Sequence, residues 1–157
     1  MSVSIKLEGV GSVQSVFREL ADEIGDKKAN SKILIPAVRE SMKPVLAKAR
    51  ADAPVNTGGL KRSLQVEARR PNRKDKRSKY IANTDTVISL VTTAPGKKLA
   101  KLGIKSDARA IAQEFGTARN PAHPYLRAAL ESQSTSVVNN LAGILARRID
   151  QYKKANL

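Results

Sequence analysis

The chain has 157 residues, with 29 lysines and arginines against 14 acidic residues, and its formal net charge is +15. It contains no cysteine, which excludes disulfides and thiolate metal sites, and its aromatic content of 3% argues against a large aromatic-lined ligand pocket. The positive charge attracts anionic partners such as nucleic acid, acidic protein surfaces or anionic lipid, without choosing among them.

The length suits one domain over residues 1–157, and the 41% hydrophobic content suits a folded core built from aliphatic side chains. The first nine residues lack the apolar run of a signal peptide, and no apolar stretch reaches the ~18 residues of a membrane span. We therefore expect no membrane partner, and a protein that is kept in a cytoplasm or packed into a particle assembled there.

The N-terminal part predicts a strand followed by a helix. Residues 3–7 alternate apolar and polar side chains, which is typical of a half-buried strand. Helical spacing of apolar residues follows, with Ser12 or Ser15 as alternative N-caps, and the helix is expected to reach Ile24. Gly25 and Asp26 are expected to close it.

A second helical pattern covers residues 35–49. Pro36 suits a first helical turn, whereas Pro44 inside a helix removes one hydrogen bond and costs ~3 kcal/mol, which predicts a kink or break near Ser41. The pair at 53–54, Ala-Pro, is expected to end the element.

The middle of the chain predicts a β-hairpin with a long tip. Residues 56–59 form a turn, 60–63 suit one helical turn, and 64–68 alternate as a strand with one solvated face. Residues 80–94 are predicted as a third, central strand. The charged tip between these strands, near 70–79, is expected to be a mobile loop.

The C-terminal part predicts a second mobile basic loop near 95–105, a short strand at 111–115, and a long helix. Pro124 suits the first position of that helix, which then spans about 25 residues and ~38 Å. The order of elements predicts an α+β fold: a small antiparallel sheet with two N-terminal helices and a long C-terminal helix packed on one face.

No catalytic arrangement emerges from the residue pattern. His123 is the single histidine, and no nucleophile or carboxylate partner is implied by spacing, so we interpret it as a residue that packs near a helix start. The acids Asp22, Glu23 and Asp26 lie together near a helix end, where a solvated face is favoured over metal binding. We expect no enzyme activity, no cofactor and no metal.

The strongest electrostatic feature is the stretch from Lys61 to Lys79, with nine basic residues against Glu67 and Asp75. A solvated loop, a protein contact and a non-specific DNA contact explain it equally well. Weak anion binding near Gly58 is a lesser alternative to a simple turn, because the spacing of a phosphate-binding loop is absent.

Two blocks of sequence are not explained by any catalytic or binding chemistry. The first runs from Ala53 to Leu64, APVNTGGLKRSL; the second runs from Glu114 to Leu130 and contains EFGT followed by PAHPYLRAAL. In order, spacing and chain length these blocks resemble the tail-completion, or head–tail joining, neck proteins of tailed bacteriophages. The resemblance covers nearly the whole chain.

The resemblance implies a structural virion protein at the head–tail junction, assembled in the bacterial cytoplasm. It implies a ring, with six copies expected, that connects the head connector to the tail tube and contacts connector, terminator and tail-tube proteins; a non-specific basic DNA-binding protein is the alternative. Glu114 is expected to pair with Arg119 or Arg127 and so pin its loop to the last helix.

The resemblance also implies roles for two groups of residues. Those expected to contact other subunits or partners are Arg62, Arg70, Arg73, Lys74, Lys76, Arg77, Lys97, Lys98, Glu114, Arg119 and Arg127. Those expected to determine the fold are Pro54, Thr57, Gly58, Gly59, Phe115, Gly116, Thr117, Pro121 and Pro124.

Overall fold

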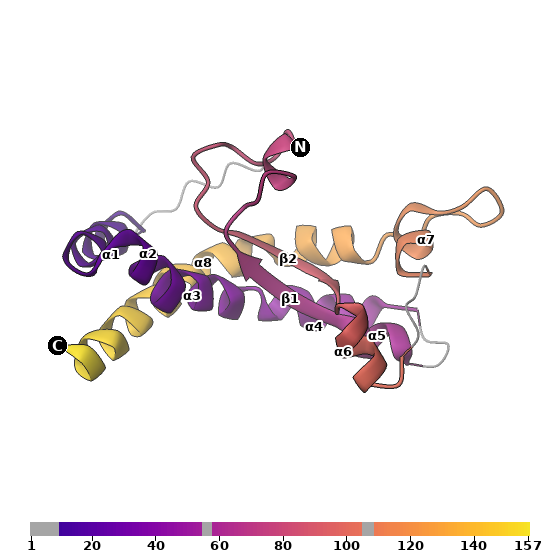
Figure 1. The fold of residues 1–157 in the computed structure, drawn as a ribbon. Helices are drawn as coiled ribbons and strands as arrows, with labels where there is room; N and C mark the ends of the chain where they lie inside the picture. Colours follow the sequence, from indigo (N-terminus) through magenta and orange to yellow (C-terminus); the bar gives the residue numbers. More distant parts are fainter. Residues whose placement is uncertain (1–9, 55–57, 105–108) are drawn as a thin grey trace. The chain divides into compact units, whose positions relative to one another are not determined.

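The computed structural model describes residues 10–54, 58–104 and 109–157 (Figure 1); the strand predicted at 3–7 lies outside these ranges. The described residues group into two compact units. The first contains residues up to Ser41, Ala68–Leu90 and Ser136–Leu157, and the second contains Met42–Glu67 and Val91–Thr135. The single-domain assignment stays a prediction.

The first unit begins with consecutive helical segments: α1 (Val10–Ile24), α2 (Asp26–Ala29), a π-helical turn η1 (Asn30–Leu34) and α3 (Ile35–Ser41). The predicted end of the first helix at Ile24 is confirmed, because Gly25 has φ +90° there. Asp26 was expected to help end the first helix, but it begins α2, because the backbone returns to a helical conformation directly after Gly25.

Aliphatic packing between α1, the η1–α3 segment and the C-terminal helix α8 (Leu126–Asn156) forms the core of the first unit. Leu20, Ile33 and Ile149 are at most 2% exposed, and Ala37 and Leu145 complete the buried cluster. Partly buried side chains pack around it; these include Phe17, Leu34, Leu141 and Tyr152. This core confirms the long C-terminal helix packed against earlier helices.

The second predicted helix is interrupted where its proline pattern indicates. α3 ends at Ser41, and α4 runs from Lys43 to Asp52 with Pro44 in its first turn, where no intrahelical N–H bond is lost. Ala53 takes an extended conformation and ends α4, as predicted from the following proline.

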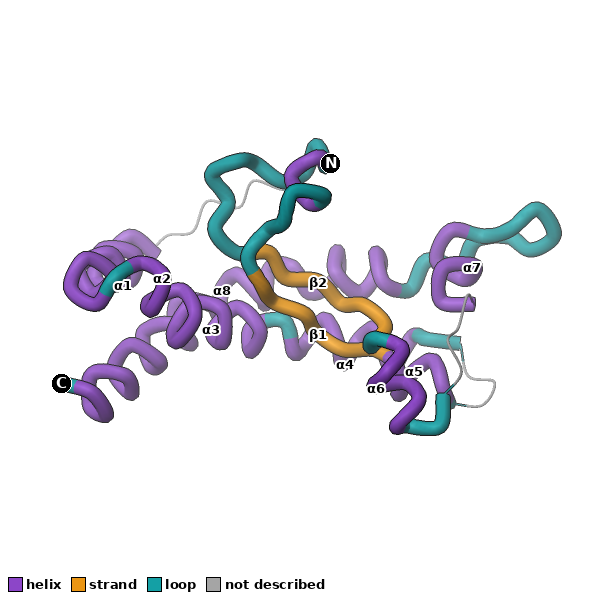
Figure 2. Tube along the Cα trace, in the orientation of Figure 1, coloured by secondary structure: helices purple, strands orange, loops and turns teal. Residues whose placement is uncertain are grey.

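The sheet has two strands in the described residues, β1 (Leu64–Arg69) and β2 (Ile88–Thr93), which lie side by side (Figure 2). The N–H of Ala94, just after β2, donates to the carbonyl of Ser63, just before β1, at 2.7 Å. The end of β2 therefore lies beside the start of β1, which makes the pair antiparallel and confirms the hairpin and the α+β class.

The second strand is shorter than the predicted residues 80–94, and it is not central among the described strands. Asp85 explains the difference: its carboxylate accepts a hydrogen bond from the N–H of Ala82 at 2.9 Å, and its own N–H donates to the carbonyl of Ala82. This turn occupies backbone groups that a strand would use, so pairing starts only at Ile88.

Two further predictions were wrong. The segment predicted as a loop near 95–105 contains a helix, α6 (Gly96–Lys101). After α6 the N–H of Ile104 donates to the carbonyl of Leu99, and Gly103 adopts φ +68°, which ends the helix. The strand predicted at 111–115 is instead part of α7 (Arg109–Phe115), whose Ala, Arg, Gln and Glu residues are strong helix formers.

The last helix, α8, has 31 residues and a length of about 46 Å, longer than predicted. It begins at Leu126, so Pro124 lies two residues before the helix rather than at its first position. In the ranges that the structure describes, no helix is both long and apolar enough to cross a membrane.

Candidate assembly surfaces

A hydrogen-bonded turn orders the tip of the β1–β2 hairpin. The guanidinium of Arg69 forms a two-pronged ion pair with Asp75, with Nη2 lying 3.1 Å from Oδ1. Asn72 Oδ1 accepts hydrogen bonds from the backbone N–H groups of Lys74 and Asp75 at 2.8 and 3.0 Å. Hydrogen bonds from Arg69, and then from the Asn72 N–H, lower the pKa of Asp75 to about 2.

This braced turn presents unneutralised positive charge. Asp75 is its one acid, and Arg69 already pairs with it. The remaining cations are exposed: Arg70, Arg73, Lys74, Lys76, Arg77 and Lys79. Lys79 Nζ also lies 5.1 Å from the centre of the Tyr80 ring, and the residue Tyr80 is 66% exposed.

The first motif turns the chain from α4 into the sheet. Gly58 has φ +74° and precedes the short helix α5 (Gly59–Ser63), while Leu60 and Leu64 are 8% and 1% exposed. Pro54 lies just past the end of α4, and Thr57 lies outside the described residues. Arg50 Nη2 donates to the carbonyl of Leu64 at 2.8 Å, which ties α4 to the start of β1.

Three basic residues predicted to contact partners, Arg62, Lys97 and Lys98, lie on the surface of the second unit. Exposed Arg62 joins Arg50 and Lys61 around a shallow hollow of about 380 Å³. On α6, Lys97 is exposed, and Lys98 Nζ donates to Gln65 Oε1 on β1 at 2.8 Å. Each therefore offers positive charge at the surface of the second unit.

In the second motif a buried carboxylate caps the last helix. Glu114 is 7% exposed, and its two oxygens accept hydrogen bonds from the backbone N–H groups of Leu126 and Arg127 at 2.9 and 3.0 Å. These N–H groups have no partner within α8, and the helix N-terminus favours negative charge. Glu114 does pin its loop to the helix start, but it does so through the backbone.

That outcome corrects the predicted ion pair. Within the described residues, no ion pair joins Glu114 to Arg119 or Arg127. Both arginine side chains are exposed, so they remain candidates for contacts with other subunits.

Tight backbone packing fixes the rest of the motif. Gly116 has φ +77°, and a Cβ there would lie 2.8 Å from the nitrogen of Ala122, so a side chain is excluded by both strain and space. Thr117 N–H donates to Asn120 O, and Thr117 Oγ1 accepts from Asn120 N–H at 3.1 Å. Pro121 and Pro124 are exposed and act through the backbone alone.

Phe115 and His123 lie on this same motif with exposed side chains. Phe115 is 67% exposed, so its ring contributes little to the core, in contrast to the expected fold-determining role. His123 is exposed, and its backbone N–H donates to Gln113 O at 2.7 Å. In the described part of the chain, no group of three His, Asp or Glu side chains is placed to hold a metal ion.

Sequence reasoning missed an ion-pair cluster in the first unit. Glu40 on α3 binds Arg147 and Arg148 on α8, with Arg148 Nη2 at 2.7 Å and Nε at 3.0 Å from Glu40 Oε2. Hydrogen bonds from Arg147 and then Arg148 lower the pKa of Glu40. The partners are 107 and 108 positions apart, so no local pattern indicates them.

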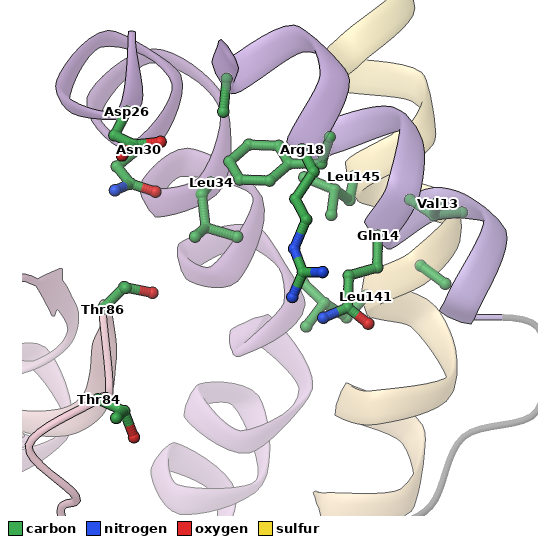
Figure 3. A pocket seen from close by; sticks show the side chains of 13 residues that line it. Val13, Gln14, Arg18, Asp26, Asn30, Leu34, Thr84, Thr86, Leu141 and Leu145 are labelled. Atoms are coloured by element: carbon green, nitrogen blue, oxygen red, sulfur yellow. The ribbon is translucent and has the colours of Figure 1, made fainter.

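The first unit also contains a pocket of about 500 Å³ (Figure 3). Its apolar lining comes from α1, η1 and α8, and consists of Val13, Phe17, Ala21, Leu34, Leu141, Ala142 and Leu145. Arg18 and Asp26 lie at its edge, and Thr84 and Thr86 lie on a separate segment across the opening from Arg18.

The described residues form an α+β fold with an exposed cationic turn at the tip of its hairpin. The family model described as "Bacteriophage HK97-gp10, putative tail-component" matches residues 17–116. The chain therefore belongs to the HK97-gp10-like family, and it is a phage tail-related structural component. Comparison with curated proteins and with solved structures gives no significant match.

Proposed function

We propose that this chain is a non-enzymatic structural protein of the phage neck, which forms or joins a ring between the head connector and the tail tube. The observation that carries the proposal is the family match over residues 17–116, which includes the whole first motif and the start of the second. Six copies is the number that the resemblance to neck proteins implies. In such a ring, one repeated heterologous contact closes around an axis.

The surfaces of the chain support an assembly role. All ten basic residues predicted to make partner contacts are exposed, and they are distributed over both units. Charged side chains at the edge of an interface speed association and select partners more than they add affinity. The acidic faces of neighbouring connector, terminator or tail-tube proteins are the partners that such charge fits.

Cryo-EM of intact virions tests the proposal. We expect density for this chain in a ring at the head–tail junction. A phage lacking the gene is expected to accumulate filled heads and separate tails, and complementation with His123→Ala is expected to restore joining. Absence of the chain from the junction of well-resolved particles contradicts the proposal.

The braced turn at residues 70–79 favours non-specific DNA binding as a second candidate function. The turn carries six exposed cations, and it lacks the apolar centre typical of protein interfaces. Neutralising phosphates releases counterions, so the affinity for duplex DNA would fall steeply with salt, with a slope of ~0.9 per phosphate.

A salt titration with matched variants tests DNA binding. We expect neutralisation of four turn residues to reduce the salt slope by about 3 to 4, whereas four neutral substitutions elsewhere change it little. The turn variant is Arg73→Gln, Lys74→Gln, Lys76→Gln and Arg77→Gln, and the control is Lys27→Gln, Lys28→Gln, Lys153→Gln and Lys154→Gln. No binding of the wild-type chain at low salt removes this candidate.

A further inference from the structure

The hollow of about 380 Å³ in the second unit is lined by cations from two separate helices. Arg50 comes from α4, whereas Lys61 and Arg62 come from α5, and Ala51 is the one uncharged residue of the described lining. Lys61 is half-buried, and both arginines are exposed. The turn of the first motif, where Gly58 has φ +74°, therefore brings three positive charges around one hollow.

No acid neutralises the three cations in the part of the chain that the structure describes. Between positions 41 and 66 the sequence contains a single acid, Asp52. Its carboxylate is already paired with Lys48, whose Nζ lies 3.1 Å from Oδ2. No ion pair of the described residues includes the cations of the hollow. Charges of one sign that line a concave surface concentrate their potential there, which favours a bound anion.

Arg50 is held in place before any ligand arrives. Its Nη2 donates to the carbonyl of Leu64 at 2.8 Å, so the side chain is tied to the start of β1. A guanidinium has five N–H donors, and this single bond leaves others for a ligand. Because its position is already fixed, less side-chain entropy is lost when an anion binds.

The lining fits a phosphate group better than a protein surface or a nucleotide base. Ala51 is the single apolar residue of the described lining, whereas protein interfaces have an apolar centre. None of the three tyrosines and two phenylalanines lines the hollow, so a base would find no ring on which to stack. Two arginines and a lysine supply the charge-assisted donors that phosphate oxygens accept.

We infer that Arg50, Lys61 and Arg62 form a binding site for a phosphate group, either free inorganic phosphate or a phosphate of the DNA backbone. The site lies in the second unit, whereas the braced turn at residues 70–79 lies in the first, so it is a separate anionic contact. It does not depend on a ring at the neck. Virion imaging that places the chain elsewhere leaves the site standing, and loss of the site leaves the ring standing.

NMR titration of the full-length chain with inorganic phosphate tests the site. We expect saturable shifts at the backbone amides of Lys61 and Arg62 and at the Arg50 side chain. The double variant Lys61→Gln, Arg62→Gln should bind at least about 10-fold more weakly, because it loses charge-assisted hydrogen bonds. Its urea unfolding should match the wild type, since neither side chain has a hydrogen-bond partner in the described ranges.

A control variant with the same change in charge separates a site from general attraction. Lys27→Gln, Lys28→Gln removes two exposed cations of α2 and should leave phosphate binding at the hollow nearly unchanged. Equal weakening in both double variants, or no saturable shift in the wild type, overturns the inference.

Titration with duplex DNA distinguishes the two sources of phosphate. If the DNA backbone is the ligand, the hollow variant should reduce the salt slope of DNA binding by about 1 to 2, and inorganic phosphate should compete at the hollow. If free phosphate is the ligand, the variant weakens phosphate binding and leaves DNA binding unchanged. Both results support the site. An oligoglutamate peptide that shifts the same amides and is not displaced by phosphate overturns the inference in favour of an acidic protein partner.

Discussion

The carboxylate of Glu114 and the backbone nitrogen of Leu126 lie 2.9 Å apart, although twelve positions separate them in the sequence. This bond and its companion to Arg127 let one side chain of α7 satisfy two donors at the start of α8. The role that an N-cap residue usually has within its own helix is thus taken by a residue of the preceding helix.

Replacing Glu114 tests this cap. We expect Glu114→Ala to lower the free energy of unfolding by about 1–2 kcal/mol, because two N–H groups beside a side chain that is 7% exposed lose their acceptor. Glu114→Gln keeps one acceptor oxygen and should cost less. Urea unfolding at neutral pH measures both variants.

Glu131→Ala, on the exposed surface of the same helix, is the control and should change the free energy by less than about 0.5 kcal/mol. Equal losses for Glu114→Ala and Glu131→Ala would show that the cap contributes nothing specific.

Three glycines provide a graded prediction about backbone strain. Gly116→Ala meets both a positive φ and a backbone atom at 2.8 Å, whereas Gly58→Ala meets the positive φ alone with open space around it. We expect a loss of about 1–2 kcal/mol at Gly58 and a clearly larger loss at Gly116. Chemical denaturation of the two variants should give that order.

Gly143 is the matched control, because it lies inside α8 and an added methyl group would meet nothing within 4 Å. Gly143→Ala should stabilise the chain by up to about 1 kcal/mol through helix propensity. The reverse order for Gly58 and Gly116 would contradict the close packing of Gly116 against Ala122.

The pH dependence of Asp75 follows from its ion pair. Its pKa falls from an ordinary 3.8 to about 2 in the folded chain, so the stabilisation is present above the higher value and is lost as the pH falls through the lower one. We expect the stability difference between wild type and Asp75→Asn to shrink between about pH 4 and about pH 2. Urea midpoints across this range measure the difference.

Asp150→Asn, at an exposed position, serves as the control for this experiment. A wild-type-minus-Asp75→Asn difference that stays constant down to pH 2 would mean that the Arg69 pair does not stabilise the turn.

Elements whose signals act locally are the ones that the sequence predicts best. Gly25 and Pro44 act on their own backbone, and both the end of α1 and the break before α4 were predicted from them. The hairpin was predicted from the alternation in β1, but Asp85 shortened its second strand through a local turn. Helix propensity decided α7, where a short strand had been predicted from Ile111 to Phe115.

The contacts that define the candidate surfaces depend on longer distances. A role for Glu114 at the helix start was predicted from its position, but its bonds go to backbone groups, which every residue carries and no pattern marks. The exposure of Phe115 likewise depends on how α7 ends, and an apolar residue in a motif is expected in the core until the structure places it.

The Glu40 cluster yields the last prediction, because it joins α3 to α8 through one carboxylate and two arginines. Glu40→Gln leaves Arg147 and Arg148 adjacent without their shared anion. A double-mutant cycle with Arg148→Gln should give a coupling energy of about 0.5–1 kcal/mol, and the cycle with Arg147→Gln should give less. The reason is that Arg148 makes two hydrogen bonds and its side chain is 31% exposed, against 52% for Arg147.

Urea unfolding at low and high salt measures both cycles, and both couplings should weaken as salt screens the charges. A coupling that is stronger for Arg147 would contradict the geometry, because the more exposed cation would then hold α3 and α8 together.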